Sequence, residues 1–171
     1  MNNTKIEIGK IKNIGGEEFI ILDILKNGVL CLSKDFAYTD TMFDSTSNNY
    51  ANSSIRKILN TEFLKRIADA VGEENILETE IDLTSDDGLD DYGKVVDKVG
   101  LLTADMYRKY NRIIEKYPVN DWWWLSTAWS TPHRGYTYAV RCVNFSGALL
   151  ILNCSFDYGV RPFLIFSSSI F

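Results

Sequence analysis

The 171-residue sequence contains no glutamine, a single histidine and three cysteines. A catalytic dyad or triad that needs histidine would have to use His133, which lies in the turn-like segment STPHRG, and no nucleophile motif such as G-x-S-x-G is present. Three cysteines without short spacings argue against a disulfide framework or a zinc site. We therefore expect a protein that is not an enzyme, that uses no cofactor and no metal, and whose thiols are buried and reduced.

Long apolar runs are also missing. No stretch is long enough to span a bilayer, and the N-terminus MNNTKIEIGK has no apolar signal-peptide core. We expect no membrane insertion and a cytoplasmic protein as synthesised, with association with a virion as an alternative. The net charge of −5 gives no reason to expect a nucleic-acid partner.

Charge is distributed unevenly along the chain. Residues 1–117 carry 21 acidic against 15 basic side chains, whereas residues 118–171 carry only three arginines and two aspartates. No lysine, glutamate or methionine follows Lys116. The simplest explanation is that buried β segments avoid long charged side chains.

The apolar periodicity predicts an α+β fold in one domain over residues 1–171. Alternation predicts strands over 5–12, 76–83 and 98–102. Apolar runs on either side of Asn27-Gly28 predict a hairpin of residues 18–25 and 29–33 with a type I′ turn.

Two helical regions and a C-terminal β region complete this prediction. One helix should follow a cap at Ser53 or Ser54, with a break at Asn60-Thr61, and the other should follow Thr103 and end before Pro118. The segments 138–144, 147–154 and 158–166 predict a three-stranded antiparallel meander. The aspartate-rich segment 84–93 lacks the ligand order of an EF-hand, which favours a solvated loop.

All four tryptophans lie in the segment NDWWWLSTAW, residues 120–129. In an extended chain Trp122 and Trp124 share one face and Trp123 lies on the other. We take Trp129 as a candidate exposed anchor. Burial of all four rings is the alternative.

The C-terminal third has the composition of a binding surface, because tyrosine and tryptophan offer rigid contact area and serine and asparagine offer adaptable hydrogen bonds. The contacting segments would be WSTPHRGYTY, VNFSG and NCSFDYG, and we expect a protein or glycan ligand, with a homo-oligomer as a further option. Arg161, between apolar residues, is predicted to form an ion pair or to bind backbone carbonyls. The candidate ligand-binding residues are Trp129, Ser130, Thr131, His133, Arg134, Tyr136, Tyr138, Asn144, Phe145, Asn153, Ser155, Phe156, Asp157 and Tyr158.

Four segments in order resemble blocks of the DUF6273 family, a set of bacterial and prophage proteins. NNYANSSIRKILNTEFL is similar to "Y-x-x-S-x-I-R-x-W-L-N-x-x-F", DKVGLLTADMYRKY to "D-K-V-F-L-L-S-x-x-E-Y-x-x-Y", WWWLST to "W-W-L-R-S" and GVRPFL to "G-V-R-P-A-L". Ile58, Gly100 and Ser126 depart from these blocks. Trp123 and Trp124 match the "W-W-L" block, and the resemblance therefore implies that both lie in the core. The resemblance implies a C-type-lectin-like fold, shared with formylglycine-generating enzyme. Such a fold has a mixed or antiparallel sheet, paired N- and C-terminal strands, two flanking helical regions and a ligand surface on loops.

The resemblance also implies three hypotheses for function. Some lectin-fold prophage proteins are targets of diversity-generating retroelements, which mutate adenines, often in asparagine codons that cannot become Lys, Glu, Gln, Met or Trp. A variable ligand-binding module would therefore fit the composition of the C-terminal third. The second hypothesis is thiol-dependent oxidation at Cys142 and Cys154, as in formylglycine-generating enzyme. The third is a structural subunit of a phage particle.

Overall fold

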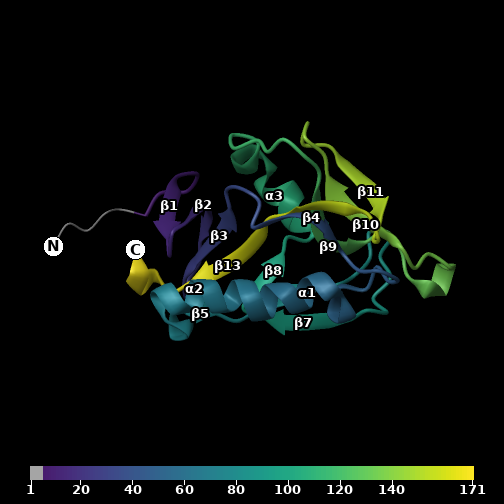
Figure 1. Cartoon of the computed structure of the whole chain (residues 1–171), viewed down its shortest axis with the longest axis horizontal. Helices are drawn as coiled ribbons and strands as arrows, with labels where there is room; N and C mark the ends of the chain where they lie inside the picture. The colour runs from purple at the N-terminus through teal and green to yellow at the C-terminus, as the bar shows by residue number, and fades with distance from the viewer. Residues whose placement is uncertain (1–5) are drawn as a thin grey trace.

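The protein is described here by a computed structural model that covers residues 6–171. It is an α+β structure of strands and two helical regions, as predicted (Figure 1). The first strands are β1 (Ile11–Ile14), β2 (Glu17–Ile24), β3 (Val29–Ser33) and β4 (Tyr38–Met42). The strand predicted over 5–12 begins outside the described residues, and within them β1 starts only at Ile11. It starts late because Gly9 turns the chain with φ +82°.

One sheet brings together strands from both ends of the chain. Its order is β1-β2-β3-β13-β5, where β5 is Ile76–Leu77 and β13 is Pro162–Phe166, and β8 (Val99–Leu101) also pairs with β13. Antiparallel pairing of β13 with β3 places Phe163 opposite Leu32 and Phe166 opposite Val29. The predicted pairing of an N-terminal with a C-terminal strand is therefore present.

The hairpin of β2 and β3 is confirmed, but its predicted type I′ turn is wrong. Neither Asn27 nor Gly28 has a positive φ, and the turn is closed by a hydrogen bond from Leu25 N to Gly28 O of 2.8 Å. Gly28 is needed for another reason, because a Cβ there would lie 2.4 Å from the carbonyl oxygen of Phe166. Glycine is therefore required at position 28 by the close approach of β13, which no local sequence pattern reveals.

The second sheet is mixed, with the order β11-β10-β9-β12-β4. Its C-terminal strands are β9 (Trp123–Ala128), β10 (Ala139–Val143), β11 (Leu149–Asn153) and β12 (Asp157–Val160). β10 and β11 form the predicted antiparallel pair, but the three-stranded meander is wrong. β12 instead pairs with β4 and, through Gly159 and Trp123, in parallel with β9, while β13 joins the other sheet. The chain crosses between the sheets at Arg161, a change of partner that turn signals do not encode.

The first helical region is continuous: α1 (Ser54–Ile58), a π-helical turn (Leu59–Phe63) and α2 (Leu64–Val71). Ser53 caps it by accepting a hydrogen bond from Arg56 N, as predicted. The break predicted at Asn60-Thr61 is this π-helical turn, in which the Asn60 side chain bonds both backbone groups of Val99. The wider turn keeps buried residues on one face although they recur every four positions, namely Ile55, Leu59, Phe63 and Ile67.

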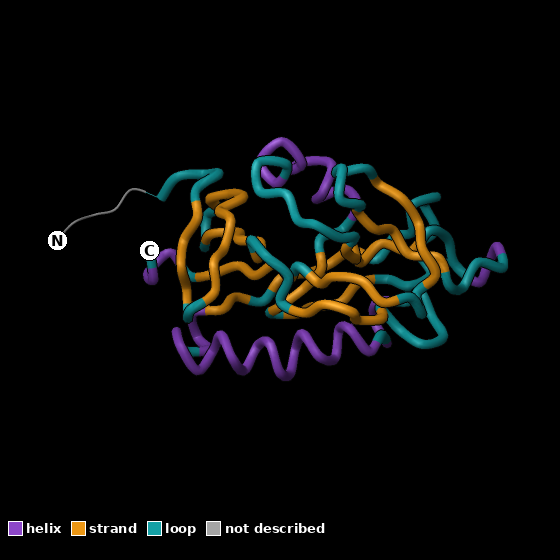
Figure 2. The backbone as a smooth tube through the Cα atoms, turned by 45° about the horizontal axis from the view of Figure 1, so that its top comes forward, coloured by secondary structure: helices purple, strands orange, loops and turns teal. Residues whose placement is uncertain are grey.

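The remaining elements lie between the α1–α2 region and β9 in sequence. The strand predicted over 76–83 is two strands, β5 and β6 (Thr79–Asp82), and β6 pairs only with β7 (Lys94–Asp97). The second helix, α3 (Ala104–Ile114), is capped by Thr103, which accepts from Met106 N at 3.1 Å as predicted. The α1–α2 region and α3 flank the strands on opposite sides (Figure 2).

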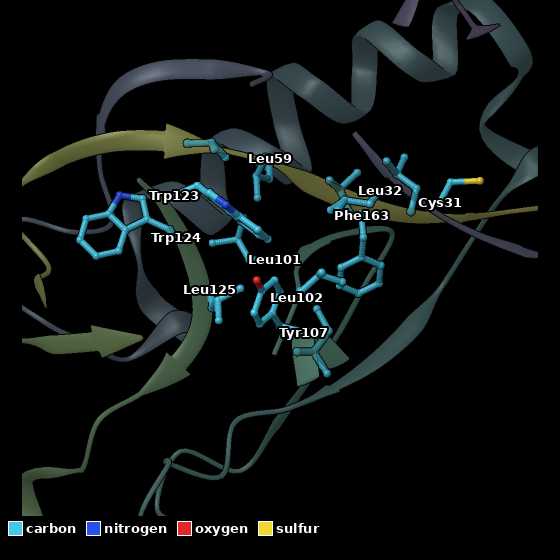
Figure 3. Packing of buried hydrophobic residues seen from close by; sticks show 14 of the residues in the cluster. Cys31, Leu32, Leu59, Leu101, Leu102, Tyr107, Trp123, Trp124, Leu125 and Phe163 are labelled. Carbon is cyan, nitrogen blue, oxygen red and sulfur yellow. The ribbon is translucent and has the colours of Figure 1, made fainter. Parts of the chain in front are cut away.

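The core contains Trp123 and Trp124, as predicted, and both are almost completely buried (Figure 3). The ring of Trp123 packs edge-on against Tyr107 of α3, at 5.7 Å between centroids. Trp122 and Trp124 lie on the other face, where both contact Tyr158. The alternation of faces expected for an extended strand therefore holds.

One departure from the family blocks is balanced inside this core. Gly100 lies where the blocks have phenylalanine, and Phe163, its cross-strand partner, lies where they have alanine. A Cβ on Gly100 would lie 2.4 Å from Ile81 and 2.8 Å from the Phe163 ring. The aromatic volume is thus supplied from β13 instead of β8.

Candidate binding surface

The base of the loop between β9 and β10 is held by one buried side chain, Asn48. Its Nδ2 donates to the carbonyls of Ser130 (3.0 Å), Tyr136 (3.3 Å) and Ala139 (3.0 Å). Its Oδ1 accepts a hydrogen bond of 2.6 Å from the Tyr92 hydroxyl. The side chain is completely buried, so these bonds replace water and fix where the loop starts and ends.

The aspartate-rich segment 84–93 docks against the same loop and does not simply lie in solvent. Asp87 accepts from Ser130 Oγ at 2.8 Å, and Asp91 accepts from Thr131 Oγ1 at 2.9 Å. The segment is a loop with Asp87, Asp90 and Asp91 exposed, as expected, and Asp87 and Asp91 in addition bond the neighbouring loop. The carboxylates satisfy buried hydroxyls of a distant segment, and such pairing is invisible in the local sequence.

Asp86 anchors this acidic segment to the second sheet. Burial raises the pKa of Asp86, but hydrogen bonds from Arg141 and Arg108 outweigh it, and the pKa lies below its ordinary value of 3.8. The guanidinium of Arg141 also lies over the ring of Trp129, 4.8 Å from its centroid. Trp129, the candidate exposed anchor, is therefore half-buried beneath an arginine.

The candidate ligand-binding residues differ in their exposure. Ser130 and Thr131 are buried and bond the aspartates just described. Trp129, Asn144, Ser155 and Tyr158 are half-buried. The exposed ones are His133, Arg134, Tyr136, Tyr138, Phe145, Asn153, Phe156 and Asp157.

Some of the candidates use their side-chain oxygens to form hydrogen bonds within their own turns. The Oδ1 of Asn144 accepts from the backbone nitrogens of Ser146 and Ala148, both at 2.9 Å. The Oδ1 of Asn153 accepts from the backbone nitrogen and the hydroxyl of Ser155. These asparagines shape the loops, and ligand contact would have to use their remaining amide groups.

Two of the three candidate segments meet at one end of the second sheet. Cys154 N donates to the carbonyl of Tyr138 at 2.7 Å, which joins the segment before β10 to the one after β11. We call the exposed residues gathered there the loop-end surface. Its members are His133, Arg134, Tyr136, Tyr138, Asn153 and Phe156.

The loop-end surface projects outward. The short 3-10 turn Pro132–Arg134, with Gly135 in the left-handed region after it, protrudes at the far right of Figure 1 (light green). The aspartate-rich segment 84–93, which we call the acidic loop, contacts this turn, because Arg134 Nη1 lies 3.5 Å from Asp87 Oδ2.

The third candidate segment, VNFSG, lies elsewhere. β10 and β11 pair from Ala139 with Asn153 at one end to Val143 with Leu149 at the other. Phe145, in the tip of this hairpin, is therefore separated from the loop-end surface by the length of both strands. The tip packs beside α3, where Tyr107 Oη donates to Gly147 O at 2.7 Å.

Sequence patterns do not reveal the residues that organise the surface. Asn48 lies in a polar stretch that predicts only a turn, and the pattern around Asp86, Asp87 and Asp91 predicts solvent exposure. One signal points to them: the arginines after residue 117 outnumber the acids there, so partners have to come from earlier in the chain.

The three cysteines are free thiols in buried positions. Burial raises the pKa of Cys31 and of Cys142 to about 12, and burial also raises the pKa of Cys154. Thiolate formation, which nucleophilic chemistry requires, is therefore disfavoured at these positions at neutral pH. Within residues 6–171, no three His, Cys, Asp or Glu side chains are placed to hold a metal ion.

None of the helices in the described part of the chain combines the length and apolarity that crossing a membrane demands. No curated protein and no solved structure matches the sequence significantly. The sequence model of a domain of unknown function, DUF6273, matches residues 26–168, which include the acidic loop, both helical regions and the loop-end surface. The chain therefore belongs to the DUF6273 family.

Proposed function

We propose that the domain is a recognition module that binds a protein partner through the loop-end surface. The observation that carries the proposal is the exposure of three large aromatic rings on a fixed base. Tyr136, Tyr138 and Phe156 are 52%, 53% and 51% exposed. Aromatic residues and arginine are enriched where proteins bind one another, and the exposed Arg134 belongs to the same surface.

The shape of the surface favours a protein over a glycan or a small ligand. Small-molecule sites are concave, whereas this surface protrudes around Pro132–Arg134 (Figure 2). Its base is held by Asn48 and the acidic loop, so the rings can be presented without much ordering on binding. Binding would use aromatic contact and hydrogen bonds, with no covalent step.

The test compares capture of partners by two variants of the full chain. The surface variant carries Tyr136→Ala, Tyr138→Ala and Phe156→Ala. The control variant carries alanine at three exposed apolar positions elsewhere, Ile8, Ile24 and Val96. We expect a protein enriched by the wild type and by the control to be lost with the surface variant.

Equal capture by all three chains would contradict the proposal. Capture of labelled glycans by the wild type alone would replace the protein with a glycan as the ligand. Sedimentation of the same chains measures self-association, and a dimer lost only in the surface variant would make a second copy of this chain the partner.

We also propose, from the resemblance, that the fold is C-type-lectin-like and that a diversity-generating retroelement varies this surface in a prophage-encoded protein. Pairing of β3 with β13 and the flanking helical regions support the fold. The exposed polar and aromatic loop residues support the variation. The protein would be cytoplasmic as synthesised, and a place in the virion would follow if it serves phage attachment.

Sequencing the 3′ end of the gene across a natural host population tests this variation. We expect substitutions at adenine positions in codons of exposed residues such as Tyr138 and Asn153. Codons of the buried Ser130, Thr131 and Trp123 should stay constant, since their side chains hold the scaffold. A uniform sequence would remove the diversification and leave a module with one fixed partner.

A further inference from the structure

Arg161 lies between β12 and β13 with its side chain almost completely buried, 1% exposed. Its Nε donates to Ser33 O at 3.1 Å and its Nη2 to Lys34 O at 2.8 Å, so the predicted binding of backbone carbonyls is confirmed. The guanidinium also lies over the ring of Trp123, 5.0 Å from the centroid. These contacts orient the group but leave part of its hydrogen-bonding capacity unused.

No carboxylate neutralises this cation at close range within residues 6–171. Burial lowers the pKa of Arg161 to about 10, and Asp35 opposes that shift only through space. Asp35 is itself exposed and lies 3.8 Å from Lys34 Nζ. A buried charge without a counter-charge is unfavourable, and an anion that reached it would be bound in a water-poor setting.

Arg161 lines a cavity of about 70 Å³. The other walls come from α3, the segment between α3 and β9, β9 itself, and the end of β10 with the hairpin tip that follows it. They include Tyr107, Trp123, Val143, Phe145 and Val119. The hydrogen bond of 2.7 Å from Tyr107 Oη to Gly147 O fixes the hairpin tip over it. Nη1 of Arg161 forms no hydrogen bond with any described residue, which leaves donors for a ligand.

We propose that this cavity is a binding site for a short-chain aliphatic monocarboxylate, whose carboxylate would bind Arg161 and whose alkyl tail would contact the aromatic and apolar walls. Guanidinium and carboxylate match in charge and in planar geometry. The site lies at the opposite end of the β10–β11 pair from the loop-end surface and does not depend on the proposed function.

The charge and the size of the cavity select this class of ligand. The single arginine balances one negative charge, whereas phosphate carries closer to two. Glu115, which also lines the cavity, repels any anion, and it repels phosphate more strongly because of that second charge. The accessible space of about 70 Å³ is small, which favours a ligand of a few heavy atoms over a sugar ring or a nucleotide.

The test is titration of propionate into the full ¹⁵N-labelled chain, followed through the Nε–H resonance of Arg161 and the indole N–H of Trp123. Propionamide has the same shape without charge, and inorganic phosphate has charge without the tail. The blocking variant is Val119→Phe, which fills the cavity. Val96→Phe, the same change at a site that is 58% exposed, is the matched control.

We expect a saturable shift of both resonances with propionate and none with propionamide or phosphate. Val119→Phe should weaken binding at least about tenfold, and Val96→Phe should leave it unchanged. The absence of saturation up to roughly 0.1 M propionate would overturn the site, as would equal binding by both variants. Binding of phosphate as tight as that of propionate would overturn the assignment to monocarboxylates. If Val119→Phe does not fold, the comparison of propionate with propionamide on the wild-type chain still tests whether the site binds a carboxylate.

Discussion

Replacement of Asn48 by alanine should destabilise the protein although Asn48 touches no predicted ligand. The change removes two N–H donors and one acceptor from a completely buried position. It leaves Ser130 O without its partner in a buried residue, while Ala139 O keeps a second bond of 2.9 Å from Trp129 N. The other two partners, Tyr136 O and the Tyr92 hydroxyl, belong to residues that are exposed or half-buried and can bind water.

The magnitude follows from this difference between the partners. An unsatisfied buried carbonyl costs about 1–3 kcal/mol, and each hydrogen bond that water can replace contributes about 0.5–1 kcal/mol. We therefore expect Asn48→Ala to lower the free energy of unfolding by about 3 kcal/mol. Asn48→Asp should cost more, because its oxygen would face carbonyls where Nδ2 now donates.

Urea unfolding at pH 7 measures this loss, with Asn52→Ala as the control because Asn52 is exposed and its side chain forms no hydrogen bond with a described residue. Amide hydrogen exchange would add the location, since protection should fall first in residues 129–139. A loss below about 0.5 kcal/mol, or a loss equal to that of Asn52→Ala, would refute the idea that Asn48 holds the loop.

Three further predictions concern other parts of the molecule. Cys31 and Cys142 should react with a thiol reagent at pH 8 only on unfolding, because burial raises the pKa of both to about 12, and fast labelling of the folded chain would contradict this. Asp86→Asn should lower the free energy of unfolding by about 2 kcal/mol at pH 7. Since the folded-state pKa of Asp86 is depressed, the difference in urea unfolding between wild type and variant should shrink as the pH falls below 3.8. Gly100→Phe should destabilise strongly, and Phe163→Ala in the same chain should restore part of the loss in a thermal double-mutant cycle; additive effects would show that the two positions share no space.

Local rules predict the elements whose causes are local. Thr103 caps α3 and Ser53 caps α1, because a side-chain oxygen next to a free backbone N–H acts over a few residues. The strands of the β2–β3 hairpin follow from the apolar pattern alone, whereas the burial of Trp123 and Trp124 is what their match to the family block implies. The candidate site is predictable at the level of segments, and two of its three segments do meet.

Predictions fail where a distant segment decides the outcome. Glycine is required at position 28 because a side chain there would clash with the Phe166 carbonyl. The predicted meander is wrong because β12 and β13 pair with β4 and β3, which are far away in sequence, and not with β11. Composition groups Phe145 with the other loops, although its hairpin tip lies at the opposite end of two strands. No periodicity records such choices of partner.

The uneven distribution of charge has a structural explanation in part. Arg141 and Arg134 pair with Asp86 and Asp87 of the acidic loop, and Arg161 bonds carbonyls of β3 and the residue after it. Two of the three arginines in the last third of the chain thus obtain their counter-charges from the first two thirds. A change in the acidic loop should therefore move the loop-end surface without any substitution in it.

Burial alone cannot explain the absence of lysine, glutamate and glutamine after residue 116. It accounts for the absence in β9 and β13, where nearly every position is buried. It does not account for residues 132–136, 145–148, 150–151 and 156–157, which are exposed and would tolerate a long polar side chain. Those positions carry mostly rings, small residues and short polar groups, with Leu150 and Ile151 and a single long polar side chain, Arg134. A lysine in their place would hold water that a partner must remove. Recognition or diversification therefore has to explain only why lysine, glutamate and glutamine are absent from the exposed positions. Burial already explains their absence from the buried strands.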